Sequence, residues 1–221
     1  AQQVPDELLA AGIGRAEQYR VVPPGIDRPI EQPRAEARAS FGVPSGARII
    51  AFVGRLVGVK RPDRFMEVAH ALSRLHDDLY FLVAGEGDRL AATRTAAVAL
   101  GDRCRFLGWT SDVGAIYSAA DAVLLTSDNE GMPVALIEAA MLGCPSVATR
   151  VGSVDEVVLD GQTGLLCRPD VGEIAVATSR LLLDESLRRK LGSAAATFAN
   201  ASFGVERLAN DTAAIYEELV G

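Results

Sequence analysis

Short apolar runs alternate with amphipathic stretches along most of this 221-residue chain. Turn-forming residues flank each run, which is typical of strands buried on both faces of a parallel sheet. The runs lie at residues 47–54, 79–85, 104–109, 121–127, 146–149 and 163–169. Amphipathic helices are predicted between them, among others at 61–75, 88–101 and 173–184. This rhythm predicts an α/β fold: a Rossmann-like doubly wound parallel sheet of about six strands with helices on both faces.

The two ends of the chain depart from that alternation. Residues 1–18 have a helical pattern that ends at Gly12 and Gly14, and residues 19–27 are predicted to form a short strand closed by a Pro-Gly turn. A helix is expected at 34–41. The last forty residues are helical in pattern with no strand after them, so we expect one domain with short appendages and a helical C-terminal segment.

Composition narrows the classes of partner. The chain is 49% hydrophobic but only 5% aromatic, so its core must consist mainly of Ala, Val and Leu. A net charge of −7 and a pI near 4.9 argue against nucleic acid or an anionic membrane as the main partner. An anionic small molecule would therefore need a local basic spot.

Cysteine and histidine usage predicts neither disulfides nor a metal site. Cys104, Cys144 and Cys167 are widely spaced in or beside apolar strands, so we expect buried free thiols and a reducing cytoplasm. His70 and His76 lie on and just after one predicted surface helix, with no ligand at metal spacing. No leader or membrane span is evident. The chain begins at Ala1, which indicates a processed protein or part of a longer one.

Residues 121–149 hold the first group of candidate site residues. A strand at 121–127 is followed by the loop DNEGMP and a helix in which Pro133 fits the first turn, while Gly143 ends it. The loop thus faces a helix N-terminus at the carboxyl end of a strand, where open α/β sheets bind ligands and phosphate is favoured. Glu130 and Glu138 flank it, and carboxylates suit vicinal hydroxyls. The pattern predicts a sugar nucleotide; the alternative is a solvated loop Glu and a surface helix Glu.

A second group follows the first strong strand. Gly54 ends that strand, Arg55 offers a planar fork and Lys60 a point charge at the start of the next helix, a combination suited to a diphosphate. The alternative is a surface loop with two solvated cations. The segment is not a GxxxxGKS/T phosphate loop, and GEGDRL at 85–90 is not a GxGxxG fingerprint, so nucleoside triphosphate or dinucleotide binding is disfavoured.

Seven motifs together resemble the donor-binding half of the retaining group 1 glycosyltransferases with a GT-B fold, over roughly residues 20–200. They occur in one order, as VVPPGID (21–27), GRLVGVKRPD (54–63), GEGDR (85–89), RFLGW (105–109), EGMPVALIEAA (130–140), GCPSVAT (143–149) and VVLDGQTGLL (157–166). The sequence departs from the family at Pro24, where Asn is frequent, and at Arg61, where Gly is. Arg61 adds a cation and a Cβ beside the phosphate site.

The resemblance implies a role for each matching residue. Arg55 and Lys60 would neutralise the donor diphosphate, Glu130 would hold the transferred sugar, and Glu138 would bind the ribose. The remaining donor-binding residues that the resemblance implies are Gly54, the turn and helix start at Gly131, Met132, Pro133 and Val134, and the base-framing loop at Trp109, Thr110 and Asp112. Trp109 could equally belong to the core.

The resemblance also implies a mechanism and a partner domain. A hexosyl unit would move from a nucleotide-diphosphate sugar to an acceptor hydroxyl with retention, with no metal, no cofactor and no protein nucleophile; Asp128 is expected to be a solvated loop residue. The acceptor would bind a second, N-terminal α/β domain that this sequence lacks. Residues 1–18 would be its end or a linker, residues 19–221 the donor domain, and 205–220 the return toward it. Any membrane contact would come through the absent domain.

Two other readings stay open at this stage. A sugar-nucleotide epimerase or a phosphorylase shares the two-domain architecture, although a phosphorylase needs a pyridoxal phosphate lysine and Lys190 falls in a late amphipathic helix. A non-catalytic sugar-nucleotide-binding module that acts with a separate partner chain would carry the same residues. By itself, this chain is expected to bind donor nucleotide weakly and to catalyse nothing.

Overall fold

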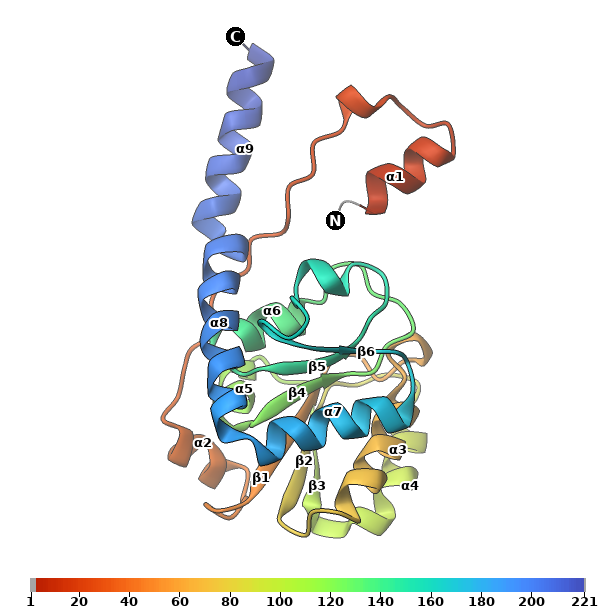
Figure 1. Cartoon of the computed structure of the whole chain (residues 1–221), viewed down its shortest axis with the longest axis vertical. Coiled ribbons are helices and arrows are strands. Elements are labelled where there is room, and N and C mark those ends of the chain that lie inside the picture. The colour runs from red at the N-terminus through yellow and green to blue at the C-terminus, as the bar shows by residue number, and fades with distance from the viewer. Residues whose placement is uncertain (1–2, 221) are drawn as a thin grey trace.

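A six-stranded, all-parallel sheet forms the centre of the computed structural model, which describes residues 3–220 (Figure 1). Its strand order is β3-β2-β1-β4-β5-β6, so the order reverses between β1 and β4. The predicted doubly wound sheet is confirmed. The strands are β1 (Arg48–Val53), β2 (Leu79–Ala84), β3 (Cys104–Gly108), β4 (Ala122–Leu125), β5 (Ser146–Thr149) and β6 (Gly164–Cys167).

Helices cover both faces of the sheet (Figure 1). The α-helices are α1 (Gln3–Ala10), α2 (Arg34–Ser40), α3 (Pro62–Ser73), α4 (Leu90–Ala97), α5 (Val113–Ala119), α6 (Val134–Met141), α7 (Val171–Leu183), α8 (Glu185–Phe203) and α9 (Val205–Val220). Short 3-10 turns are η1 (Ala16–Gln18), η2 (Gly58–Lys60), η3 (Val98–Arg103) and η4 (Val154–Glu156). Strands and helices therefore alternate along the chain, as the apolar runs predicted.

Two apolar cores result, one on each side of the sheet. Side chains that alternate along a strand point to opposite faces, so Ile49 joins one core and Ile50 the other. The first core packs α2, α5, α6 and α8 against the sheet, and the second packs α3, α4 and α7. Every residue of β4 and β5 is buried, which explains their continuous apolar sequences.

Two local predictions differ from the structure. Residues 19–27 form no strand; they run as extended chain with one isolated bridge, Ile26 to Gly204, because Pro23 and Pro24 have no N–H to give a ladder. The predicted helix 88–101 starts at Leu90 and changes into η3 at Val98, where Gly101 takes a φ of 55°.

The two ends of the chain lie side by side. Ile26 N donates to Phe203 O at 2.7 Å, and Arg207 donates to the carbonyls of Pro23 and Pro24. Beyond this junction α9 extends away from the sheet, with the segment that leads to α1 beside it (Figure 1). No described side chain of α9 is buried. Of the helix expected at 1–18, residues 1–2 fall outside the described part.

Close backbone contact between α8 and the turn after α6 generates a stability prediction. A Cβ built on Gly192 would lie 2.2 Å from Gly143 O. Replacing a mid-helix glycine with alanine normally gains about 1 kcal/mol. Here we expect Gly192→Ala to destabilise the fold instead, because forced overpacking costs about 1–3 kcal/mol.

Chemical denaturation of Gly192→Ala and of Ser193→Ala would test this prediction. Ser193 is exposed on the same helix, so its replacement should be neutral or slightly stabilising. A Gly192→Ala midpoint at or above that of the unsubstituted chain would contradict the contact.

Candidate functional site

The reversal of strand order brings two loops together at the carboxyl edge of the sheet. β1 pairs in parallel with β4, with Ile50 opposite Ala122, so residues 54–61 and 126–133 leave neighbouring strands at the same edge. Such a switch point is where open α/β sheets form ligand crevices. The sequence-predicted residues Arg55, Lys60 and Glu130 all lie on these two loops.

Hydrogen bonds tie the two loops to each other. Thr126 Oγ1 donates to the carbonyls of Lys60 and Arg61 at 3.2 and 3.0 Å, and Asp128 N donates to Val59 O at 2.9 Å. Arg61 adopts a left-handed φ of 50°, unusual for a residue with a side chain. This conformation separates η2 from α3 and leaves Lys60 at the end of the loop facing β4.

Lys60 and Glu130 form the central contact of the site. Lys60 Nζ lies 2.5 Å from Oε1 and 2.6 Å from Oε2 of Glu130, although the two residues are 70 positions apart. Ser127 Oγ donates to the same Oε1 at 2.5 Å. Glu130 is 8% exposed and Ser127 is fully buried. The loop Glu is therefore held in a buried polar network and is not a solvated surface residue.

Loop 150–153 fixes the main chain of Glu130. Ser153 N donates to Glu130 O at 3.0 Å. Gly152 has a φ of 53°, and a Cβ there would lie 1.8 Å from that same carbonyl oxygen. Ser127, Thr126 and Gly152 were not anticipated as site residues. The available signal was a glycine followed by serine shortly after the strand at 146–149.

Asp128 is bound to two arginines. Arg64 donates to it at 2.7 Å and Arg61 at 3.1 and 3.2 Å. Burial alone would raise the pKa of Asp128, but these hydrogen bonds and charges outweigh burial and lower it. Its side chain is 47% exposed, so the expected contact with solvent is present, but the carboxylate is already committed to Arg61 and Arg64.

Arg55 is an exposed cation with no protein partner. Its guanidinium makes no hydrogen bond or ion pair within residues 3–220, whereas its neighbours are anchored: Gly54 N donates to Ala84 O and Leu56 N to Glu86 O. A Cβ on Gly85 would lie 2.0 Å from Gly54 O, so the loop after β2 supports this one closely. Arg55 can therefore take an anion without first losing a partner.

The amino end of α6 follows the loop of Glu130. Pro133 is the N-cap, one position earlier than the first-turn place the sequence suggested, and no side chain caps the helix. Gly131 and Val134 are exposed and Met132 is half-buried. Uncapped N–H groups at a helix start are suited to an anion.

Glu138 lies in the middle of α6 against α5. Tyr117, itself 1% exposed, donates its hydroxyl to Glu138 Oε2 at 2.9 Å. Burial raises the pKa of Glu138, and the bond from Tyr117 opposes this only in part. Glu138 is thus a half-buried carboxylate with one oxygen held and is no ordinary surface helix residue.

The structure places the three residues expected to frame the base, Trp109, Thr110 and Asp112, in different surroundings. Trp109 is 74% exposed, so the alternative that it belongs to the core was wrong. Asp112 caps α5 through Ala115 N at 3.3 Å and accepts from Gln32 Nε2 at 3.0 Å, so its carboxylate has a structural task. Thr110 and Asp112 line a cavity of ≈ 200 Å³ together with Leu107.

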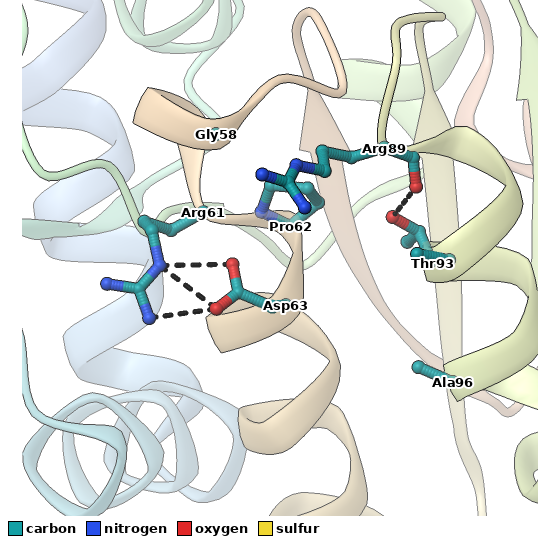
Figure 2. Close-up of a pocket in the computed structure, with 8 residues that line it drawn as sticks. Gly58, Arg61, Pro62, Asp63, Arg89, Thr93 and Ala96 are labelled. Carbon is teal, nitrogen blue, oxygen red and sulfur yellow. Dashed lines mark hydrogen bonds and ion pairs between the residues drawn. The ribbon is translucent and has the colours of Figure 1, made fainter.

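A separate cavity of ≈ 260 Å³ lies between the start of α3 and α4 (Figure 2). Arg61, which is paired with Asp63, borders it, and Arg89 extends toward Gly58. None of the sequence-predicted site residues lines this cavity. The guanidinium of Arg61, the residue that departs from the family pattern, donates to the carboxylates of Asp63 and Asp128.

The three cysteines are free, as expected, although Cys104 is only partly buried. Burial raises the pKa of Cys104 and Cys144 to about 12 and that of Cys167 to about 11. His76 is buried rather than on the surface, and burial, with the charge of Arg48, lowers its pKa. Within the described residues no group of three or more His, Cys, Asp and Glu could hold a metal, and no helix there could cross a membrane.

Comparison with known proteins identifies the family. Residues 33–198 match the family described as glycosyl transferases group 1. A D-inositol 3-phosphate glycosyltransferase of Saccharomonospora viridis is 35% identical over 96% of this chain and 53% of its own length. Sucrose-phosphate synthase of Thermosynechococcus elongatus superposes with a TM-score of 0.83 at 27% identity, over 97% of this chain and 56% of that one.

A third similar protein, HepE of Anabaena solved with UDP, gives a TM-score of 0.90 at 23% identity, over 99% of this chain and 62% of that one. The chain belongs to the group 1 glycosyltransferases and has the fold of one half of a GT-B enzyme. It spans about half the length of the curated relatives that it matches.

The burial of Glu138 generates a prediction about pH. A carboxyl group whose folded pKa is raised stabilises the fold below its unfolded pKa, about 4.3, and loses that contribution as pH rises through the folded value. Glu138→Gln keeps an acceptor for Tyr117 and removes the charge. We expect it to be more heat-stable than the unsubstituted chain at pH 7 and nearly equal to it at pH 4.

Melting temperatures at the two pH values would decide the matter. Glu67→Gln, at an exposed position of α3, is the control and should behave alike at both. A Glu138→Gln variant that is less stable than the parent at pH 7 would show that the carboxylate is not penalised by burial.

Proposed function

We propose that residues 19–221 bind a nucleotide-diphosphate sugar and form the donor half of a retaining hexosyltransferase. The observation that carries the proposal is the meeting of Lys60 and Glu130 at the switch point of the sheet. A cation for phosphate and a carboxylate for sugar hydroxyls thus come from adjacent loops. HepE, solved with UDP, supports a nucleoside diphosphate as the ligand class.

The diphosphate would lie between Arg55 and the amino end of α6. The guanidinium of Arg55 has no hydrogen-bond partner within residues 3–220, and the first N–H groups of α6 have no side-chain cap. Lys60 would divide its three donors between Glu130 and the phosphates. Because charge develops on the leaving diphosphate in the transition state, these donors act where stabilisation is most effective.

The two glutamates would hold the two sugars. Glu130, fixed by Ser127 and by Ser153 N, would accept hydroxyls of the transferred hexose. Glu138 has one oxygen on Tyr117 and the other available for the ribose. Gly131, Met132 and Val134 would approach the phosphates, while Trp109 and Thr110 would frame the base.

The transfer would need neither a metal nor a protein nucleophile. Arg55 and Lys60 would supply the positive charge that a divalent cation supplies in other transferases. Asp128, the nearest carboxylate to Glu130 along the chain, is held by Arg61 and Arg64 and is thereby a weaker nucleophile. The acceptor hydroxyl would lose its proton to the departing phosphate on the same face of the sugar.

Complete transfer would require an acceptor-binding half in addition to this chain, which spans about half the length of its curated relatives. The sheet described here would contact the donor from one side of the crevice only. We therefore expect nucleotide binding without turnover from this chain.

Nucleotide binding can be tested with a thermal-shift screen of UDP, GDP and ADP. We expect one nucleotide to stabilise the chain, by about 2.7 kcal/mol at a concentration near 100 Kd. The stabilisation should disappear in Glu138→Ala because the ribose loses its acceptor.

Glu67→Ala, at an exposed site on α3, should retain the full response. If no nucleotide stabilises the chain, or if both variants respond equally, the assignment of the ribose site fails.

Catalysis can be tested in a protein that joins this chain to its acceptor half. Arg55→Ala and Lys60→Ala should each lower kcat about a hundredfold, on the order of 3 kcal/mol in the barrier. Lys190→Ala removes the other lysine, which is exposed on α8, and should leave kcat unchanged. Losses below threefold in both site variants would refute the role of the pair.

A further inference from the structure

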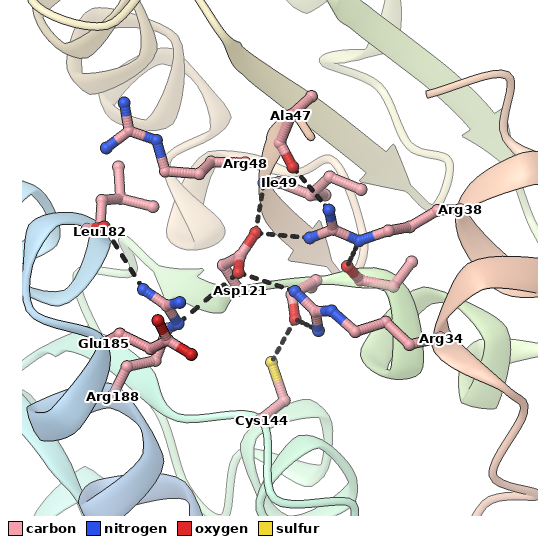
Figure 3. Close-up of polar contacts among 12 residues, drawn as sticks. Arg34, Arg38, Ala47, Arg48, Ile49, Asp121, Cys144, Leu182, Glu185 and Arg188 are labelled. Atoms are coloured by element: carbon pink, nitrogen blue, oxygen red, sulfur yellow. Dashed lines mark hydrogen bonds and ion pairs between the residues drawn. The ribbon is translucent and has the colours of Figure 1, made fainter. Parts of the chain in front are cut away.

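A cluster of arginines surrounds Asp121 (Figure 3). It lies at the amino edge of the sheet, opposite the edge of Lys60 and Glu130. Asp121 directly precedes β4 and is 5% exposed. Arg34 donates to its Oδ1 at 2.7 Å. Arg38 and Ile49 N donate to its Oδ2 at 2.7 and 2.8 Å. Three short bonds therefore use most of the acceptor capacity of this carboxylate.

Arg188 is left without a short bond to that carboxylate. Its Nε lies 3.6 Å from Asp121 Oδ1, which is too long for a hydrogen bond. Its Nη1 donates to the carbonyls of Leu181 and Leu182 at the end of α7, at 3.0 and 3.3 Å. Nη2 of Arg188 and Nε of Arg34 have no hydrogen-bond partner within residues 3–220. The guanidinium groups of Arg34 and Arg188 therefore each have N–H donors that are available to a ligand.

The cluster carries excess positive charge. Arg34, Arg38 and Arg188 face the single carboxylate of Asp121. Burial lowers the pKa of Arg38, and the charges of Arg34 and Arg188 lower it further against the attraction of Asp121. The ion pairs at the rim, Arg189 with Glu185 and Arg28 with Glu31, are each neutral and leave the excess uncompensated. A local excess of positive charge is unusual in a chain whose net charge is −7.

A cavity opens beside this cluster. Its volume is ≈ 470 Å³, and Arg34, Asp121 and Arg188 line it together with Glu185. The volume falls within the roughly 300–1,000 Å³ of small-molecule sites. None of the predicted donor residues lines this cavity.

We propose that this cavity binds a phosphate dianion, either free or as a small phosphate monoester. The N–H groups of Arg34 and Arg188 that have no partner provide planar, charge-assisted hydrogen bonds of the kind that arginine gives to phosphate. The dianion balances the two excess charges around Asp121. Glu31 and Glu185 are the opposing groups, since both carboxylates border the same space; Glu31 is paired with Arg28 at 2.7 Å and Glu185 with Arg189 at 2.5 Å.

Isothermal titration of the whole chain with inorganic phosphate at constant ionic strength tests the proposal. Arg34→Gln and Arg188→Gln should each weaken binding at least tenfold, which corresponds to about 1.4 kcal/mol. Glu185→Gln should tighten binding because it removes one of the two opposing charges. Arg180→Gln is the matched control: it makes the same charge change at an exposed site on α7 and should bind like the parent.

Three results would overturn the proposal. One is the absence of saturable phosphate binding by the unsubstituted chain. Another is equal weakening in Arg180→Gln, which would show a general effect of charge. The third is loss of binding in Arg55→Gln together with retention in Arg34→Gln, which would place phosphate at the carboxyl edge instead. Because Arg188 also bonds to the end of α7, circular dichroism should confirm that its variant is folded.

A parallel titration with glucose 6-phosphate separates the two sources of the anion. Tighter binding than that of inorganic phosphate, with the same dependence on Arg34 and Arg188, supports a phosphate monoester as the ligand. Equal affinity supports the free ion. Binding of the monoester that is indifferent to both arginines would overturn the site.

Discussion

The contact between Lys60 and Glu130 depends on the parallel pairing of β1 with β4, which brings the loops after these two strands together. Its two members are 70 residues apart, and each lies on a loop that leaves its strand at the reversal of strand order. Burying such a pair is costly, because desolvation of both ions must be offset by their attraction and by further hydrogen bonds. Ser127 supplies one such bond to Glu130. Packed apolar side chains would often be as stable in the same place, so the pair is weak evidence for a contribution to stability.

The fold could be predicted from the sequence because its strands are buried on both faces. Continuous apolar runs such as those of β4 and β5 have one interpretation in an alternating chain. The errors arose where tertiary contacts decide. Residues 19–27 have strand-like residues, but they pack along α8 and α9 through Ile26 and Arg207 and never join the sheet. Gly101 redirects the chain after α4 through a positive φ that no periodicity reveals.

The candidate site was predictable in its residue types but not in its internal bonds. Arg55, Lys60 and Glu130 could be selected because charged residues follow buried strands at a switch point. That Lys60 contacts both oxygens of Glu130 depends on distances across the sheet, which spacing along the chain does not contain. The same holds for Gly152, which matters because its lack of a Cβ lets it lie against the carbonyl of Glu130.

The amino edge of the sheet connects to this arrangement through Asp121. The ladder between β1 and β4 is short, with register partners at Ile50–Ala122 and Ala51–Val123 only. Asp121 extends it by two bonds to Ile49: its main-chain N–H donates to Ile49 O, and its carboxylate accepts from Ile49 N. The carboxylate of Asp121 thus ties the start of β4 to β1 at the edge opposite the loops of Lys60 and Glu130. Arg34 and Arg38 hold that carboxylate in place, so the arginines at one edge and the ion pair at the other belong to the same two strands.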